Sequence, residues 1–251
     1  MLLKDLVNYL NVLLAESLFK DYCENGIQFG DPEQTINKIA LGVTADLETI
    51  EKAVSLQADV LITHHGLFWK GEPQRIIGYK KIRIDRLSQA NLSLVAYHLP
   101  LDAELTFGNN WKVAHDLGWQ NPTAFGSDSP QLGVMGNVPQ IPIEDFVSIL
   151  ERYYETSLKT AVLKGNKIVA KVSLLAGNGY REIVHSASLG CDCHITGSFD
   201  EPAWSLAKEN KINFLAFGHS ATEKVGIKGL MNHLNRDLNI PLVLIDTDNP
   251  F

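Results

Sequence analysis

The sequence has only three cysteines, no long apolar run and no excess of positive charge, and each shortage excludes a class of protein. Cys23, Cys191 and Cys193 cannot form a paired disulfide framework, so we expect a reducing compartment. No apolar stretch approaches the roughly 20 residues that cross a bilayer. A net charge of −7 argues against nucleic-acid binding driven by the phosphate backbone, but it is compatible with a small anionic ligand beside a bound metal.

The chain also lacks the usual signatures of secretion and of a catalytic nucleophile. Residues 1–14 have apolar side chains at helical spacing, without the cationic start and small-residue cleavage site of a signal peptide. We therefore predict an amphipathic first helix and a cytoplasmic protein. No Gly-x-Ser-x-Gly motif is present. Gly177-Asn178-Gly179 lacks the rest of a nucleotide-binding fingerprint and favours a tight turn.

The sequence contains an internal repeat. The segment from Lys38 onward resembles the segment from Lys171 onward without a gap, and Asp59 aligns with Asp192. Each copy has the pattern strand, helix, strand, followed by another helix and strand. The predicted strands are 39–43, 59–63 and 92–97 in the first copy, and 172–176, 192–196 and 212–217 in the second. Because strand–helix–strand units make parallel strands, we predict an α/β fold of two related α/β lobes with largely parallel central sheets.

The repeat also suggests where the chain divides. We place a first half at 1–125 and a second at 126–251, which can equally be counted as one domain, 1–251. The segment 126–167 breaks the repeat with several prolines and a predicted helix at 143–154, so we expect it to be a strand–helix insertion in the second half. The alternative is a chance similarity, because βαβ units share apolar periodicity.

Side chains that can bind metals follow the predicted strands. Ligand sites of open parallel sheets lie beyond the carboxyl ends of the strands, and the residues at these ends are His64, His65, His98, Asp102, His219 and Glu223. Neighbouring residues of a strand point to opposite faces, so two adjacent histidines reach one cleft only where the chain turns, which Gly66 would permit. The matching end of the repeat, Thr196-Gly197-Ser198, has no histidine.

The spacing of the carboxylates supports the same interpretation. His98 and Asp102 are four residues apart, as are His219 and Glu223, and each pair would share one face of a helix. Pro100 favours a loop for the first pair. Imidazole nitrogen with carboxylate oxygen suits zinc, iron, manganese or nickel better than calcium. A carboxylate can bridge two such ions, so we predict a pair of divalent metal ions in the cleft between the lobes.

Other motifs carry less information. Cys191 and Cys193 lie with His194 around a predicted strand, which favours burial over a second metal site. The segment Phe68-Trp69-Lys70 either stacks a ring beside a phosphate or packs a loop, and both interpretations stay open. Asn109-Asn110 suggests a helix cap. We interpret the remaining histidines as ordinary surface or core residues: His115, His185 and His233.

Several short motifs recur in the order known from one family. These motifs are Asn25-Gly-Ile-Gln28, Gly42-Val-Thr-Ala45, Ile62-Thr-His-His-Gly66, His98-Leu-Pro-Leu-Asp102, Gly108-Asn-Asn110, Ile195-Thr-Gly197 and Gly218-His-Ser-Ala-Thr-Glu223. By them the chain resembles, along essentially its whole length, the dinuclear-metal proteins called GTP cyclohydrolase type 2 homologues, the Nif-three-like family.

This resemblance implies a ligand set and an assembly. It implies two divalent metal ions per subunit, held by His64, His65, Asp102, His219 and Glu223, with the last residue as the bridge. It places His98 beside them as a hydrogen-bonding partner or proton carrier. It also implies a toroidal homohexamer, and this chain is of the short kind, without the large inserted domain of some relatives.

Two classes of function follow. The first is a metal-dependent hydrolase of a nucleotide or related heterocycle, in which His98 is the catalytic side chain; the family name implies opening of the purine ring of GTP. The alternative is a non-catalytic metal-binding or scaffold protein that forms a ring. The acidic balance argues against a nucleic-acid partner, and no membrane partner is expected.

Overall fold

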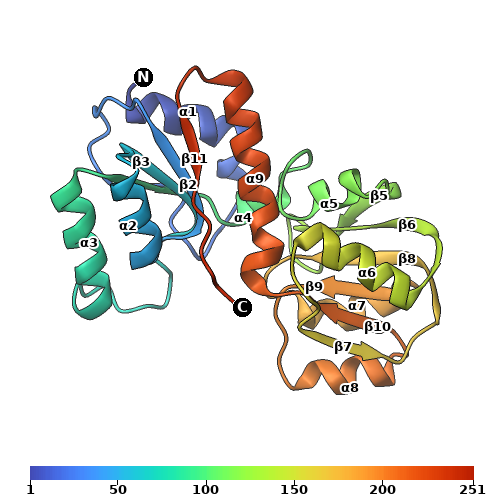
Figure 1. Cartoon of the computed structure of the whole chain (residues 1–251). Helices are drawn as coiled ribbons and strands as arrows, with labels where there is room; N and C mark the ends of the chain where they lie inside the picture. Colours follow the sequence, from blue (N-terminus) through green and yellow to red (C-terminus); the bar gives the residue numbers. More distant parts are fainter. The chain divides into compact units, whose positions relative to one another are not determined.

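The computed structural model describes residues 1–251 as two compact units, each built on one sheet (Figure 1). The first unit comprises 1–101 and 227–248, and the second comprises 102–226 and 249–251. These units differ from the predicted halves, 1–125 and 126–251. The first boundary moves because β5 (Gln120–Phe125) joins the sheet of the second unit. The second boundary arises because β11 (Leu242–Leu244) pairs in parallel with β2 (Ile39–Thr44), so the chain returns to the first sheet after it has built the second.

The sheet of the first unit has five strands. β2 and β3 are continuous apolar runs with buried side chains, as expected for parallel strands that are covered on both faces. Only β1 runs antiparallel, and it pairs with β4 at one edge. The order is β1 (Gly26–Phe29), β4 (Ser93–Ala96), β3 (Val60–His65), β2 and β11. The carboxyl ends of β2, β3 and β4 therefore meet at one edge.

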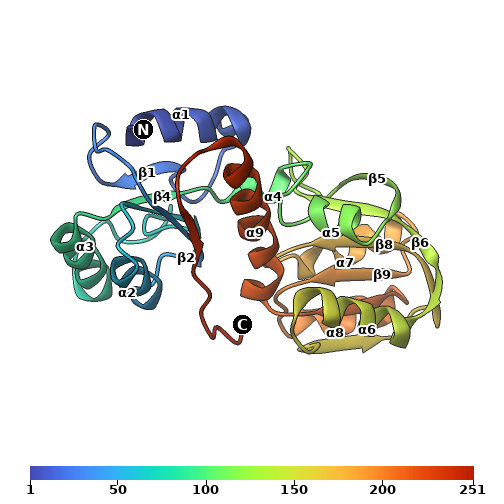
Figure 2. The same ribbon diagram turned by 45° about the horizontal axis from the view of Figure 1, so that its top comes forward.

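Helices cover both faces of this sheet, with α1 on one side and α2 on the other (Figure 2). α1 (Leu3–Leu13) is the predicted amphipathic helix and buries Leu3, Leu6, Val7 and Leu10. α2 (Leu47–Ser55) begins after Asp46, whose side chain accepts a hydrogen bond from the Thr49 backbone N–H at 2.7 Å. The remaining elements are η1 (Glu16–Leu18), α3 (Gly78–Ala90) and the later part of α9 (His219–Asp237).

The sheet of the second unit has six strands, of which the central three are parallel. The segment 126–167 supplies β6 (Gly133–Pro142), α6 (Ile143–Tyr154) and β7 (Thr160–Leu163). β6 pairs antiparallel with β8 (Ile168–Leu175), and β7 pairs antiparallel with β10 (Asn213–Ala216). The predicted insertion thus supplies the strands that flank the three parallel strands on either side. The order is β5 (Gln120–Phe125), β6 (Gly133–Pro142), β8 (Ile168–Leu175), β9 (Cys193–Thr196), β10 (Asn213–Ala216) and β7 (Thr160–Leu163).

Five helical segments lie entirely within the second unit, and α4 and α9 each cross its boundary with the first. α6 packs Ile143, Phe146, Leu150 and Tyr154 into the core with strands β6 and β8. No helix of the chain is both long and apolar enough to span a bilayer. The other helices are α4 (Leu99–Ala103), α5 (Trp111–Asp116), η2 (Tyr180–Glu182), α7 (Ile183–Ser188) and α8 (Pro202–Glu209).

The predicted internal repeat is visible in matching hydrogen bonds. Asp59 Oδ2 accepts from the backbone N–H groups of residues 37 and 38, at 2.7 and 2.9 Å. Asp192 Oδ2 accepts from those of residues 170 and 171, at 2.9 and 3.0 Å. Lys38 Nζ and Lys171 Nζ each donate to the carbonyl that follows the next helix. The predicted fold class, two related α/β lobes, is therefore confirmed.

Candidate metal centre

Three histidines gather at the edge of the first sheet. His64 and His65 end β3, and His98 follows β4, which lies beside β3 in parallel register. One ring nitrogen of each lies within 4.8 Å of the others, and the His64 ring centroid is 4.6 Å from that of His65 and 5.0 Å from that of His98. The edge that the sequence predicted as a ligand site thus carries a cluster able to hold a metal ion.

Gly66 serves this cluster differently from our expectation. Its φ is not positive, so the chain needs no glycine-specific turn here. A Cβ at Gly66 would instead lie 2.1 Å from Gln28 Nε2, and Gln28 Oε1 accepts from the Leu67 backbone N–H at 2.6 Å. The glycine therefore makes room for the glutamine that fixes the chain just after the two histidines.

The orientation of the two adjacent histidines is fixed through Nδ1. His64, which is fully buried, places Nδ1 3.1 Å from the carbonyl oxygen of Tyr97. Because a carbonyl only accepts, this nitrogen carries the proton and Nε2 carries the lone pair. His65 Nδ1 lies 3.0 Å from the Thr44 hydroxyl, which belongs to the neighbouring strand. Such bonds fix the tautomer and ring orientation of metal-binding histidines.

Asp21 fixes His98 in the same way. Its Oδ1 accepts from His98 Nδ1 at 2.7 Å, and its oxygens also accept from the backbone N–H groups of Cys23 and Leu99. Burial alone would raise the pKa of Asp21, but the hydrogen bond and charge of His98 and those N–H groups outweigh it and lower the pKa to about 2. Sequence reasoning missed Asp21, because it lies in an irregular segment that no strand end or spacing marks.

The rings that follow the histidine pair pack inside the first unit. Trp69 Nε1 donates to the carbonyl of Gly66 at 3.0 Å, and the Trp69 ring stands edge-on to His98, with 5.0 Å between centroids. Phe68 packs against the apolar core, and Lys80 Nζ lies 5.6 Å from its ring centroid. Of the two interpretations left open, these contacts favour loop packing.

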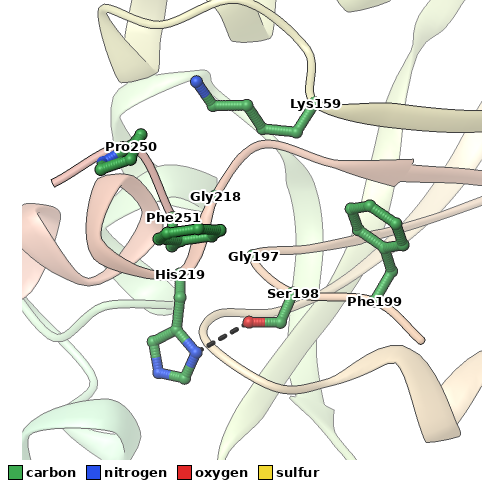
Figure 3. A pocket seen from close by; sticks show the side chains of 8 residues that line it. All are labelled: Lys159, Gly197, Ser198, Phe199, Gly218, His219, Pro250 and Phe251. Carbon is green, nitrogen blue, oxygen red and sulfur yellow. Dashed lines mark hydrogen bonds between the residues drawn. The ribbon is translucent and has the colours of Figure 1, made fainter.

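The second unit carries the remaining predicted residues on two helices. Asp102 lies in α4, so the expected loop is wrong: Pro100 occupies the first turn, where a proline costs no hydrogen bond. His219 begins α9 and Glu223 follows one turn later, with His219 Nε2 3.0 Å from Glu223 Oε1. His219 Nδ1 lies 2.8 Å from the Ser198 hydroxyl (Figure 3), so this ring too is fixed through Nδ1.

Asp102 is fixed by the two asparagines that we expected to cap a helix. Asn109 Nδ2 donates to Asp102 Oδ1 at 2.8 Å, while Asn109 Oδ1 accepts from the Gly226 backbone N–H at 2.7 Å. Asn110 Nδ2 donates to the Asp102 carbonyl at 3.1 Å, and its Oδ1 accepts from the Ala176 backbone N–H. The helix α5 has no side-chain cap. Both asparagines are fully buried; Asn109 holds the carboxylate of Asp102 and Asn110 holds its backbone.

Gly177 lies against the residues at the start of α9. The predicted tight turn is present, and the φ of Gly177 is +65°. A Cβ there would lie 2.2 Å from Glu223 Oε1 and 3.2 Å from His219 Nε2. The turn therefore brings bare backbone against these side chains, which the sequence motif alone did not suggest.

The cysteines and the histidine around β9 are buried, as the sequence indicated. His194 is fully buried between the Ser173 hydroxyl at 2.8 Å and the Gly179 carbonyl at 2.9 Å, and burial lowers its pKa to about 4. Burial raises the pKa of the Cys191 and Cys193 thiols, neither of which is in a disulfide. This cluster is part of the core.

The fold and the site define a class of protein: an α/β protein whose parallel strands end in oriented histidines. Two solved structures share this fold over the full length of both chains. One, described as protein ybgI of unknown function, has a TM-score of 0.92 and 34% identity. The other, a protein of Thermus thermophilus, has a TM-score of 0.90 and 29% identity.

Curated relatives then identify the family. A protein of Chlamydia trachomatis named GTP cyclohydrolase 1 type 2 homolog is 52% identical over 98% of each chain. A Vibrio cholerae protein of the same name is 37% identical over 96% of each. Residues 1–250 match the family described as Duf34/NIF3 (NGG1p interacting factor 3). The chain belongs to this family, which confirms the resemblance inferred from its motifs.

Proposed function

We propose that His64, His65, Asp102, His219 and Glu223 hold two divalent metal ions, with Glu223 as the bridge. The observation that carries this proposal is the common orientation of the three histidines in this set, His64, His65 and His219. Each is hydrogen-bonded through Nδ1 to a partner in its own unit, as is typical of histidines that bind metal through Nε2. The mixed nitrogen and oxygen ligands favour zinc, iron, manganese or nickel.

We further propose that the protein is a metal-dependent hydrolase of a nucleotide or related heterocycle. The names of its relatives point to this substrate class. Bound divalent ions supply an activated water and polarise the atom that it attacks. Within the chain, Asp21 holds the proton of His98 on Nδ1, which leaves Nε2 to accept a proton. The buried carboxylate then stabilises the imidazolium that forms, as in other carboxylate–histidine pairs.

The test combines elemental analysis with turnover. Purified protein is stripped with a chelator, reloaded with each candidate metal and assayed with GTP and a panel of other nucleotides. We expect about two metal ions per chain and turnover that requires them. His65→Ala should lower metal content and turnover together. His115→Ala is the matched control, because His115 is exposed and its side chain hydrogen-bonds to the Leu105 carbonyl, away from the proposed ligands.

Two outcomes would contradict the proposal in different ways. If His65→Ala and His115→Ala bind the same amount of metal as the native protein, the ligand assignment is wrong. If the loaded native protein turns over no member of the panel, the hydrolase assignment fails and the non-catalytic alternative, a metal-binding or scaffold protein, takes its place.

We also propose that the chain assembles into a homohexamer. Large apolar side chains are exposed together where α3 begins: Ile76, Ile77, Tyr79 and Ile82. Exposed apolar residues that lie together commonly mark an interface between proteins. Light scattering on the purified protein should give six times the 27.8 kDa of one chain, and the mass of a monomer would refute this. A cytoplasmic location stays a prediction.

A further inference from the structure

A pocket of about 390 Å³ opens in the second unit beside His219 (Figure 3). This volume lies in the range of small-ligand sites. The pocket lies where β9 and β10 end, the edge of a parallel sheet at which ligands bind. The side chains that line it belong to Lys159, Ser198, Phe199, His219, Pro250 and Phe251.

Two glycines of this pocket lie where the backbone packs closely against its neighbours. A Cβ at Gly197 would lie 2.5 Å from Thr222 Oγ1 and 2.8 Å from the Gly218 carbonyl oxygen. Gly218 has a φ of +106° and faces the backbone of Phe251. The Ser220 backbone N–H donates to the Phe251 oxygen at 2.8 Å, which holds the last residues beside the start of α9. These contacts fix the backbone along one side of the pocket.

Two phenylalanine rings border the pocket, and both are exposed. Phe199 is 48% exposed and Phe251 is 78% exposed, although large apolar side chains are normally buried. Figure 3 shows the two rings on either side of the space above Gly197. Exposed aromatic rings at the mouth of a pocket provide stacking surfaces for a flat ligand.

The pocket also has a charged group. Lys159 is exposed and makes no ion pair, and its stem passes beside Gly218. A lysine ammonium attracts a phosphate or carboxylate as a point charge. In a chain of net charge −7, this cation beside two exposed rings favours one kind of ligand: a flat ring with an anionic group.

We propose that this pocket binds a planar aromatic heterocycle that carries an anionic group, such as a mononucleotide. The ring stacks on Phe199 with Phe251 on the other side of the same space, and the anionic group pairs with Lys159. The inference rests on the proposed function, because it assigns the recognition of the substrate to a pocket that shares His219 with the proposed ligand set.

The test measures the binding of three probes to the full chain by calorimetry: GMP, guanosine and ribose 5-phosphate. Phe199→Ala should weaken GMP and guanosine about tenfold or more, the loss expected for one stacked base. Phe199→Leu should show most of that loss, because it keeps the apolar volume without the ring. Trp204→Ala, which removes an equally exposed ring outside the pocket, should bind GMP like the native protein.

The lysine is tested with the same probes. Lys159→Ala should weaken GMP several-fold and leave guanosine unchanged, and the difference should shrink as salt rises. The proposal is overturned if GMP does not bind, or if Phe199→Ala and Trp204→Ala bind it equally well.

Binding is measured on both stripped and metal-loaded protein, which separates this proposal from the function. If Phe199→Ala weakens GMP binding but the native protein shows no turnover, the hydrolase assignment is refuted and the pocket assignment stands. If the protein turns over GTP and Phe199→Ala changes neither KM nor kcat, the hydrolase assignment stands and the pocket assignment is refuted.

Discussion

Replacement of Asn109 by alanine should destabilise the second unit and weaken metal binding at the same time. The native side chain makes two buried hydrogen bonds, to Asp102 Oδ1 at 2.8 Å and from the Gly226 N–H at 2.7 Å. Their loss costs about 1 kcal/mol each, and the buried N–H left without this acceptor adds about 1–2 kcal/mol. We expect a loss of about 2–4 kcal/mol in the free energy of unfolding.

The same change should loosen Asp102, because Asn109 fixes the orientation of its carboxylate. Removal of such a partner typically weakens metal binding about 10- to 100-fold. Asn109→Asp tests the hydrogen-bond geometry: it keeps the shape, cannot donate to Asp102 when ionised and sets two carboxylates against each other. It should therefore bind metal no better than the alanine variant.

Urea unfolding followed by circular dichroism gives the stability, and competition with a chromogenic chelator gives the metal affinity. Asn210→Ala is the control, because Asn210 is an exposed asparagine of the same unit that makes one local bond to the Leu206 carbonyl. It should change the free energy of unfolding by about 0.5 kcal/mol or less. The reasoning is refuted if Asn109→Ala behaves like this control in both assays.

Three further predictions concern the other partners. Ser198→Ala removes the bond to His219 Nδ1 and should weaken metal binding about tenfold at nearly unchanged stability, measured by chelator competition. Asp21→Asn should flatten the pH dependence of stability. The lowered pKa of Asp21 stabilises the native fold by about 2 kcal/mol above about pH 4, and this stabilisation is lost as the pH falls towards 2. An asparagine does not titrate, so the variant has no such loss. Acid unfolding curves that superimpose would contradict this. Gly177→Ala should lower metal affinity, because its Cβ would lie 2.2 Å from Glu223 Oε1. Gly190→Ala is the control: Gly190 also has a positive φ, but its Cβ would meet no atom within 4 Å. That change should cost only about 1–2 kcal/mol of backbone strain and leave metal affinity unchanged.

Much of the fold could be predicted because the repeat is recognisable from short-range patterns of apolar and polar residues. The apolar strands, the helix 143–154 and the paired aspartates at 59 and 192 all follow from short-range sequence. So does the gathering of His64, His65 and His98, since parallel strands end at one edge. These features need only periodicity and chain order, which a single sequence contains.

The residues that orient the histidines could not be predicted in this way. Thr44, Asp21 and Ser198 act through hydrogen bonds to residues far along the chain, and no spacing links them to their partners. Asn109 and Asn110 were visible as a pair, but a helix cap was the nearest local explanation. Tertiary packing gives them a different role, because both are buried beside Asp102.

The boundary between the units also could not be predicted from short-range sequence patterns. Nothing in the short apolar run 242–244 indicates that it pairs with β2, at the far end of the sequence. Pro100 illustrates the same limit on a smaller scale, because its effect depends on the turn in which it falls.

The pairing of β11 with β2 gives the two units different histories during synthesis. Almost all of the second unit is one continuous stretch, 102–226, which can close as soon as it has left the ribosome. The first unit begins earlier, yet its sheet is completed after that of the second unit, because its edge strand lies in 227–248. Until that strand arrives, β2 presents an unpaired edge. During synthesis the first unit is therefore the one that stays incomplete longer, with a strand edge open to pairing with other chains.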